Sequence, residues 1–244
     1  MTDQPLSSAQ LSSARRHQQG FTLVEIGVVL VIIGLLLAAV LKGQELIASA
    51  RVNNLISTMN GYKAAINGFQ DRYRIVQSDS SQAATIVGNG AISCMNSCND
   101  GLINSWDAPG IVNNNLSAAG FYSGPVPTTT WEQNDKLREA SSQGGGFLTN
   151  PGGGPIYVLH TQEYDDQYNR VPLAMGIHTG WNLSSKFLAE VDRKTDDGNA
   201  LNGKMRNSKW GTTDFRNCWL GSGVWGAWVE TNPPTNCGAV ELLN

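Results

Sequence analysis

The side chain in this sequence with the clearest chemical potential is Glu25, a carboxylate inside an apolar run that continues to Leu41. The stretch from Phe21 to Leu41 holds no other charged residue. It is long enough to cross a bilayer as a helix, which takes about 20 apolar residues. A carboxylate in such a span costs roughly 2.5–3.5 kcal/mol at mid-bilayer and less toward the ends, so it marks a functional position. The alternative is an ordinary signal anchor in which the Glu occurs by chance.

The residues before the run form a short polar leader that ends in Gly20. This is not the layout of a secretory signal peptide, because the apolar block follows the Gly instead of preceding it. Arg15 and Arg16 precede the span and only Lys42 follows it directly. This charge bias predicts a cytoplasmic amino terminus.

The start of the run reads Gly20-Phe21-Thr22-Leu23-Val24-Glu25. Over residues 15–45 the chain resembles the type IV pilin and pseudopilin superfamily. The resemblance implies that a prepilin peptidase cuts after Gly20 and that the new amine of Phe21 is methylated. It also implies that Glu25 pairs with the Phe21 amine of a neighbouring subunit in a filament, because a buried opposite charge offsets the cost of an unpaired one.

The resemblance also implies partners and a location. The partners are other copies of this chain or related pilins, the prepilin peptidase and an inner-membrane assembly platform. Before assembly the subunit would sit in the bacterial inner membrane with its globular domain in the periplasm. Afterwards it would belong to an extracellular or periplasmic filament.

An apolar stripe predicts that the helix continues beyond the membrane to about Arg74, which makes it roughly 80 Å long. Its members recur in steps of three and four and therefore share one helix face. They are Val52, Leu55, Met59, Tyr62, Ile66, Phe69 and Tyr73. We expect this face to pack against the chain's own sheet; a coiled coil is the alternative, but the repeat is short for one.

The predicted fold class is α+β and pilin-like, a long N-terminal α-helix packed on an antiparallel β-sheet. The expected divisions are a leader (1–20), a membrane or filament-core half of the helix (21–42), an amphipathic half (43–74) and a globular α+β domain (75–244).

Within the globular domain, residues 75–130 are rich in Ser, Asn and Gly and are expected to form an irregular connection. A capping box at Thr129 predicts a short helix to about residue 141. Residues 155–161 and 170–178 predict two strands of a hairpin. Ser184 is expected to cap a further helix that ends at residues 196–198.

Four cysteines suit an oxidising compartment. The three-residue gap between Cys94 and Cys98 favours a local disulfide over zinc, since no second Cys or His pair at finger-like spacing accompanies it. A bridge between Cys218 and Cys237 would resemble the C-terminal bridged region of type IV pilins.

Asp192, Asp196, Asp197 and Asn199 form a dense cluster of side-chain oxygens. Ca²⁺ takes six to eight oxygen ligands, and this loop offers several. The simpler interpretation is a polar helix end and turn. We therefore predict no resident cofactor and keep these four residues as Ca²⁺ candidates.

An enzyme is not predicted. Beyond the leader the only histidines are His160 and His178, on separate predicted strands, and there is no nucleophile elbow or metal-binding His pair. The chain's net charge is −3, and loss of the leader, with Arg15, Arg16 and Asp3, makes it −4. A mildly acidic chain lacks the excess of basic residues that is typical of proteins that bind nucleic acid.

The predicted function is that of a structural subunit of a type IV pilus or pilus-like filament. One alternative is a pseudopilin of a type II secretion system. Another is a minor pilin or adhesin that binds through a Trp-rich C-terminal region containing Trp219, Trp225 and Trp228. Buried tryptophans would speak against that last alternative.

Overall fold

The structure is a computed structural model. It describes residues 22–94, 98–103, 108–126, 146–162, 164–165, 171–209, 217–220 and 226–243. The predicted helix at 129–141 lies outside these ranges.

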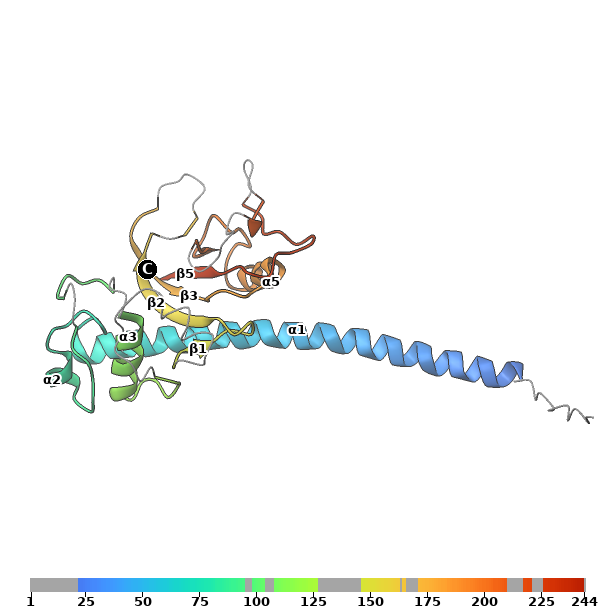
Figure 1. The fold of residues 1–244 in the computed structure, drawn as a ribbon, viewed down its shortest axis with the longest axis horizontal. Helices are drawn as coiled ribbons and strands as arrows, with labels where there is room; N and C mark the ends of the chain where they lie inside the picture. The colour runs from blue at the N-terminus through green and yellow to red at the C-terminus, as the bar shows by residue number, and fades with distance from the viewer. Residues whose placement is uncertain are drawn as a thin grey trace, which may run out of the picture. The chain divides into compact units, whose positions relative to one another are not determined.

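Helix α1 spans Leu23–Tyr73, as the sequence predicted to within two residues at its start and one at its end (Figure 1). No proline interrupts it, and it ends before Arg74, whose φ of 58° is left-handed. The chain divides into two compact units, one ending at Ile47 and the other beginning at Ala48. In the first unit the large apolar side chains of α1 are exposed.

In the second unit one face of α1 is buried. The buried residues are Val52, Leu55, Met59, Tyr62, Ala65, Ile66 and Phe69. They share a hydrophobic core with side chains of the sheet, including Ile156, Val158 and Ile177. The predicted packing of the stripe against the chain's own domain is therefore confirmed. Lys63 adds an ion pair to Glu241, which links α1 to the last strand.

The sheet is antiparallel throughout, with strand order β1-β2-β3-β5-β4 (Figure 1). Its strands are β1 (Leu148–Thr149), β2 (Pro155–Thr161), β3 (Ala174–His178), β4 (Met205–Asn207) and β5 (Ala239–Leu243). The predicted hairpin of β2 and β3 is confirmed, with Val158 opposite Ile177. Strand β3 begins four residues later than expected; Pro172, which has no N–H to donate, precedes it.

The prediction of an irregular connection over residues 75–130 was wrong in part. This region contains α2 (Ala83–Val87) and α3 (Ala108–Ala118). Helix α3 has a proline at its second position and three consecutive asparagines, and both are weak helix signals. Pro109 is tolerated because it falls in the first turn, where N–H groups have no intrahelical partner. Tertiary contacts compensate, since Val112 and Leu116 are fully buried.

Helix α5 (Ser185–Thr195) has the predicted N-cap and ends near the predicted position. The Ser184 side chain accepts a hydrogen bond from the Phe187 N–H at 3.2 Å, and Leu183 and Leu188 are both in the core. The helix ends just before the predicted turn, where Gly198 has a φ of 77°. This end of α5 carries the acidic cluster.

Candidate functional site

Glu25 and Thr22 form a reciprocal capping box at the start of α1. The Thr22 N–H and the Thr22 hydroxyl each donate to Glu25 Oε2 at 2.9 Å. The Glu25 N–H donates to Thr22 Oγ1 at 3.2 Å. This exchange satisfies N–H groups that have no helical partner. In a single chain the carboxylate is therefore held by its own helix end.

The first half of α1, around and after Glu25, has apolar side chains on every face of the helix. The exposed residues include Leu23, Val24, Ile26, Val28, Val29, Leu30, Val31, Ile32, Ile33, Leu35, Leu36, Leu37, Val40, Leu41, Leu46 and Ile47. By length and composition α1 can cross a membrane. Exposure on this scale is typical of a surface that lipid or other protein covers. Gly20 and Phe21, the predicted cleavage and methylation positions, lie outside the described residues.

Two disulfides join the cysteines in the pairs that the sequence favoured. The Cys94–Cys98 bridge closes a loop next to Asp79, whose carboxylate accepts the N–H groups of Asp100 and Gly101. The structure thus contains the local disulfide that the spacing favoured.

The second disulfide, Cys218–Cys237, lies in the core. Cys237 also exchanges two backbone hydrogen bonds with Leu183, at 3.1 and 2.8 Å. The segment before β5 is therefore joined to Cys218 by the disulfide and to the segment before α5 by backbone hydrogen bonds.

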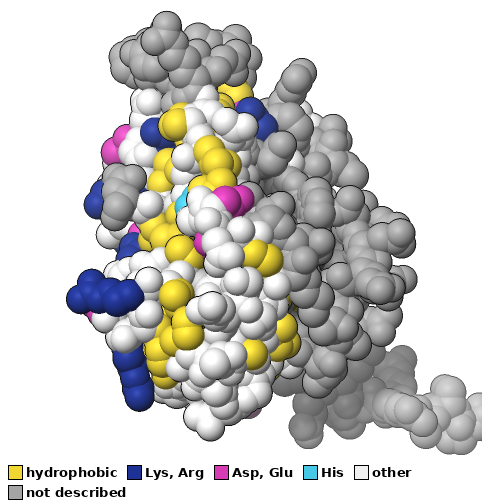
Figure 2. Space-filling model, turned by 90° about the vertical axis from the view of Figure 1, so that its left-hand side faces the viewer, with side chains coloured by type: hydrophobic (Ala, Val, Ile, Leu, Met, Phe, Trp, Pro, Cys, Tyr) yellow, Lys and Arg dark blue, Asp and Glu magenta, His cyan; other side chains and the backbone are white. Residues whose placement is uncertain are grey.

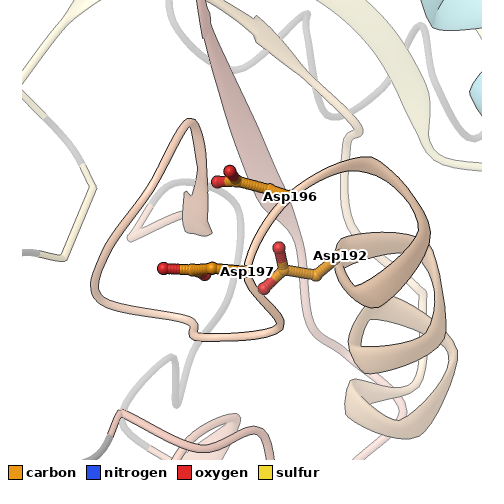
Figure 3. A group of neighbouring side chains, drawn as sticks. All are labelled: Asp192, Asp196 and Asp197. Atoms are coloured by element: carbon orange, nitrogen blue, oxygen red, sulfur yellow. The ribbon is translucent and has the colours of Figure 1, made fainter.

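The acidic cluster is assembled at the carboxyl end of α5. One carboxylate oxygen from each of Asp192, Asp196 and Asp197 lies within 4.8 Å of the others. Asp192 leaves the last turn of α5 toward the loop that carries the other two (Figure 3). Asp192 is fully buried, Asp196 half-buried and Asp197 exposed, so the cluster reaches the surface on one side.

Burial raises the pKa of the Asp192 carboxyl to about 6. The Trp228 indole, which donates to Oδ2 at 2.8 Å, opposes this rise, while the charges of Asp197 and Asp196 add to it. The Trp228 contact is one that the sequence did not indicate, because 36 residues separate the two side chains.

Asn199, the fourth candidate in this loop, supports the turn. Its Oδ1 accepts the Leu201 N–H at 3.0 Å, and its backbone forms an isolated bridge with Ala227. Asp192, Asp196 and Asp197 are brought into one group.

His160 lies on β2 and His178 on β3, and each is engaged within the domain. His178 stacks on Tyr157 with 4.7 Å between ring centroids, and its Nδ1 lies 3.4 Å from Ser208 Oγ. Burial lowers the pKa of His178 to about 3, and a substrate has no access to a fully buried ring. His160 is hydrogen-bonded to the backbone, because its Nδ1 accepts a hydrogen bond from the Ile103 N–H.

The described tryptophans of the C-terminal region are structural. Trp228 is buried against Asp192, and the partly buried Trp219 donates its indole N–H to Asp165 at 2.8 Å. Trp225 lies outside the described residues. On the face in Figure 2 hydrophobic side chains form a broken band between polar ones, and basic side chains do not gather into one patch.

Comparison with known families finds a match at the segment that contains Glu25. The model of the prokaryotic N-terminal methylation motif matches residues 15–41. No curated protein and no solved structure matches the chain significantly.

Proposed function

We propose that this chain is a structural subunit of a type IV pilus or pilus-like filament, because residues 15–41 match the prokaryotic N-terminal methylation motif. The match to this motif is the observation that carries the proposal. The matched segment belongs to a structural family rather than an enzyme family. The long apolar helix and the antiparallel sheet agree with a pilin-like α+β subunit.

Processing precedes assembly in this proposal. Prepilin peptidase removes residues 1–20 after Gly20, and the amine of Phe21 is methylated. Before assembly the subunit remains in the inner membrane. The apolar half of α1 anchors it there, and its globular domain lies in the periplasm. The assembly platform then transfers it to a filament of like subunits.

Assembly would replace lipid around the exposed apolar residues of α1 with the helices of neighbouring subunits. Glu25 would exchange its Thr22 contacts for the charged Phe21 amine of a neighbour. An ion pair in an apolar surrounding offsets the cost of each buried charge, and breaking it by removing one partner is strongly destabilising. The charge of Glu25, and not its capping role, should therefore decide incorporation.

The variant Glu25→Gln separates these two roles. Gln at this position can keep the capping box, because its side-chain oxygen still accepts the Thr22 N–H. It lacks the charge. We expect Glu25→Gln to insert into the membrane at least as well as the wild type, since an uncharged side chain costs less there. We expect it to be depleted from filaments at least tenfold, measured by immunoblot of filament and membrane fractions.

Thr22→Val is the matched control, because it removes the hydroxyl from the capping box and leaves the Glu25 charge. It should assemble close to wild-type level. Wild-type incorporation of Glu25→Gln would contradict the pairing proposal, and equal loss in both variants would assign the defect to the helix end.

A type II secretion pseudopilin uses the same processing and the same kind of assembly, and it stays the alternative within this proposal. The adhesin alternative draws no support from Trp219 and Trp228, whose indoles are engaged inside the domain.

A further inference from the structure

The disulfide between Cys94 and Cys98 differs from the other disulfide in its access to solvent. Both of its cysteines are half-buried, in the segment between α2 and α3. Cys218 and Cys237 are 1% and 0% exposed and belong to the core. In thiol–disulfide exchange a thiolate must reach a sulfur atom, so access controls the rate. The Cys94–Cys98 bond is therefore the one that an external thiol can reach in the folded domain.

Hydrogen bonds to residues 79 and 80 hold the backbone on both sides of this disulfide. The Cys94 N–H donates to the Ser80 carbonyl oxygen at 3.0 Å. The N–H of Asn99, which follows Cys98, donates to the Asp79 carbonyl oxygen at 2.8 Å. Both cysteines are therefore placed next to the same short segment by contacts that do not involve sulfur.

Side chains strengthen this placement. Asn99 Oδ1 accepts the Ser81 N–H at 3.3 Å, and Asn99 Nδ2 donates to Ser81 Oγ at 3.0 Å. The Asp79 carboxylate accepts the N–H groups of the two residues that follow Asn99, at 3.0 and 2.8 Å. On the other side of the disulfide, the Asn115 side chain of α3 accepts the Ile92 N–H at 2.7 Å and donates to the Ile92 carbonyl oxygen at 2.9 Å. These contacts remain available when the disulfide is opened.

The length of the loop also sets how far the fold protects each disulfide. The sequence separation is 4 for Cys94–Cys98 and 19 for Cys218–Cys237. Closing a short loop removes little chain entropy from the unfolded state, so the shorter bridge stabilises the fold less. Linkage works in both directions, and a fold that gains little from a disulfide also does little to stabilise that disulfide against reduction.

We propose that Cys94 and Cys98 form a reversible redox site that exchanges electrons with a protein dithiol of the thiol–disulfide oxidoreductase class while the domain stays folded. A thiolate of the partner attacks Sγ of one cysteine. A mixed disulfide forms, the Cys94–Cys98 bond breaks, and the released sulfur takes up a proton. The partner's second thiol then loses its proton and attacks the mixed disulfide, and the second cysteine leaves and is protonated. Two electrons have then passed to the cysteine pair, and the partner carries a disulfide.

The hydrogen bonds around the site explain why the exchange is reversible. They keep the two reduced cysteines beside residues 79–81, so closing the bond again is an intramolecular step over a short distance. The change stays local, because Val87 and Ala91 before the site and Ile103 after it are buried in the core. This inference does not depend on filament assembly, and its test needs no filaments.

The test uses the oxidised full chain in detergent micelles, with dithiothreitol as the dithiol. Samples taken during reduction are quenched with an alkylating maleimide, and peptide mass spectrometry reports the state of each cysteine pair. Cys218–Cys237 is the internal control. The Cys94–Cys98 bond should be reduced at least about tenfold faster than the control, while the near-UV circular dichroism of the folded domain persists. Replacing dithiothreitol by oxidised glutathione should restore the bond.

Two single variants isolate the effect of access. Cys98→Ser leaves Cys94 as a half-buried thiol, which should form a mixed disulfide with oxidised glutathione in the folded chain. Cys218→Ser is the matched control and leaves Cys237, which is 0% exposed. Its thiol should react at least about tenfold more slowly. If Cys218→Ser does not fold, the wild-type comparison decides alone.

Two results would overturn the proposal. One is reduction of both disulfides at the same rate, or of Cys218–Cys237 first, which would mean that reduction follows unfolding. The other is loss of the near-UV signal together with the Cys94–Cys98 bond, which would make this disulfide a structural requirement of the fold.

Discussion

At the scale of single residues, the domain handles buried ionisable groups by surrounding them with donors or by keeping them neutral. Asp165 takes the first course and accepts hydrogen bonds from Asn207 Nδ2 at 2.7 Å and Trp219 Nε1 at 2.8 Å. His178 takes the second, since burial in the core disfavours its charged form. These two residues come from separate segments, and their buried positions were not visible in the sequence.

The depressed pKa of His178 makes a prediction about acid stability. Its folded pKa of about 3 lies below the ordinary value of 6.5, so the unfolded chain binds a proton more readily at intermediate pH. The stability that the neutral ring contributes is complete above pH 6.5 and is lost as the pH falls toward 3. Between pH 7 and pH 5 this one group should cost about 2 kcal/mol of unfolding free energy.

Urea unfolding of the full chain in detergent at several pH values measures this loss. His178→Asn removes the titrating ring, so its unfolding free energy should fall by about 2 kcal/mol less over the same interval. Its absolute stability is expected to be lower at every pH, because a stacked ring is lost. An unchanged pH slope in the variant would show that other groups cause the acid sensitivity.

At the scale of elements, local signals predicted those parts of the fold whose pattern agrees with their tertiary role. The sequence predicted the buried stripe of α1, the strand β2 and the Ser184 cap. In α1 the buried residues follow the helical period, and Ser184 is a residue type that commonly caps helices. Helix α3 was missed because its asparagines are poor helix formers. Its conformation depends on contacts with residues distant in sequence. One example is the hydrogen bond that Asn115 Nδ2 donates to the carbonyl oxygen of Ile92 at 2.9 Å.

The disulfides differ in what they should contribute. Cys218–Cys237 closes a loop with a sequence separation of 19, and Cys94–Cys98 one of only 4. In the chain-entropy model a disulfide stabilises the fold more when it closes a longer loop. The contribution of the Cys218–Cys237 bridge is about 3 kcal/mol in this model. The double variant Cys218→Ser, Cys237→Ser should therefore lose about 3 kcal/mol of unfolding free energy and become protease-sensitive.

The double variant Cys94→Ser, Cys98→Ser is the control and should lose less. Denaturant unfolding of both variants under one set of conditions compares them. A greater loss from the shorter loop would mean that the loop at Cys94 and Asp79, and not the segment before β5, limits the stability of the domain.

At the scale of the whole molecule, the chain combines a helical unit covered in apolar side chains with a domain that has its own core. The helix in the described part of the first unit was predictable, because a long run of apolar residues indicates a helix able to span a bilayer. The acidic cluster was predictable as a set of residues, but not the contacts that hold it. Trp228 and the N–H groups of residues 204 and 205 reach it only after folding.

The most direct test of a processed filament subunit is intact-mass analysis of the chain in purified filaments. Filaments would be isolated from cells that overproduce this chain together with a prepilin peptidase and an assembly platform. The account predicts that the chain is present in them with the mass of residues 21–244 plus one methyl group. If the filaments that these cells build lack the chain, and it stays in the membrane with residues 1–20 attached, the account is contradicted.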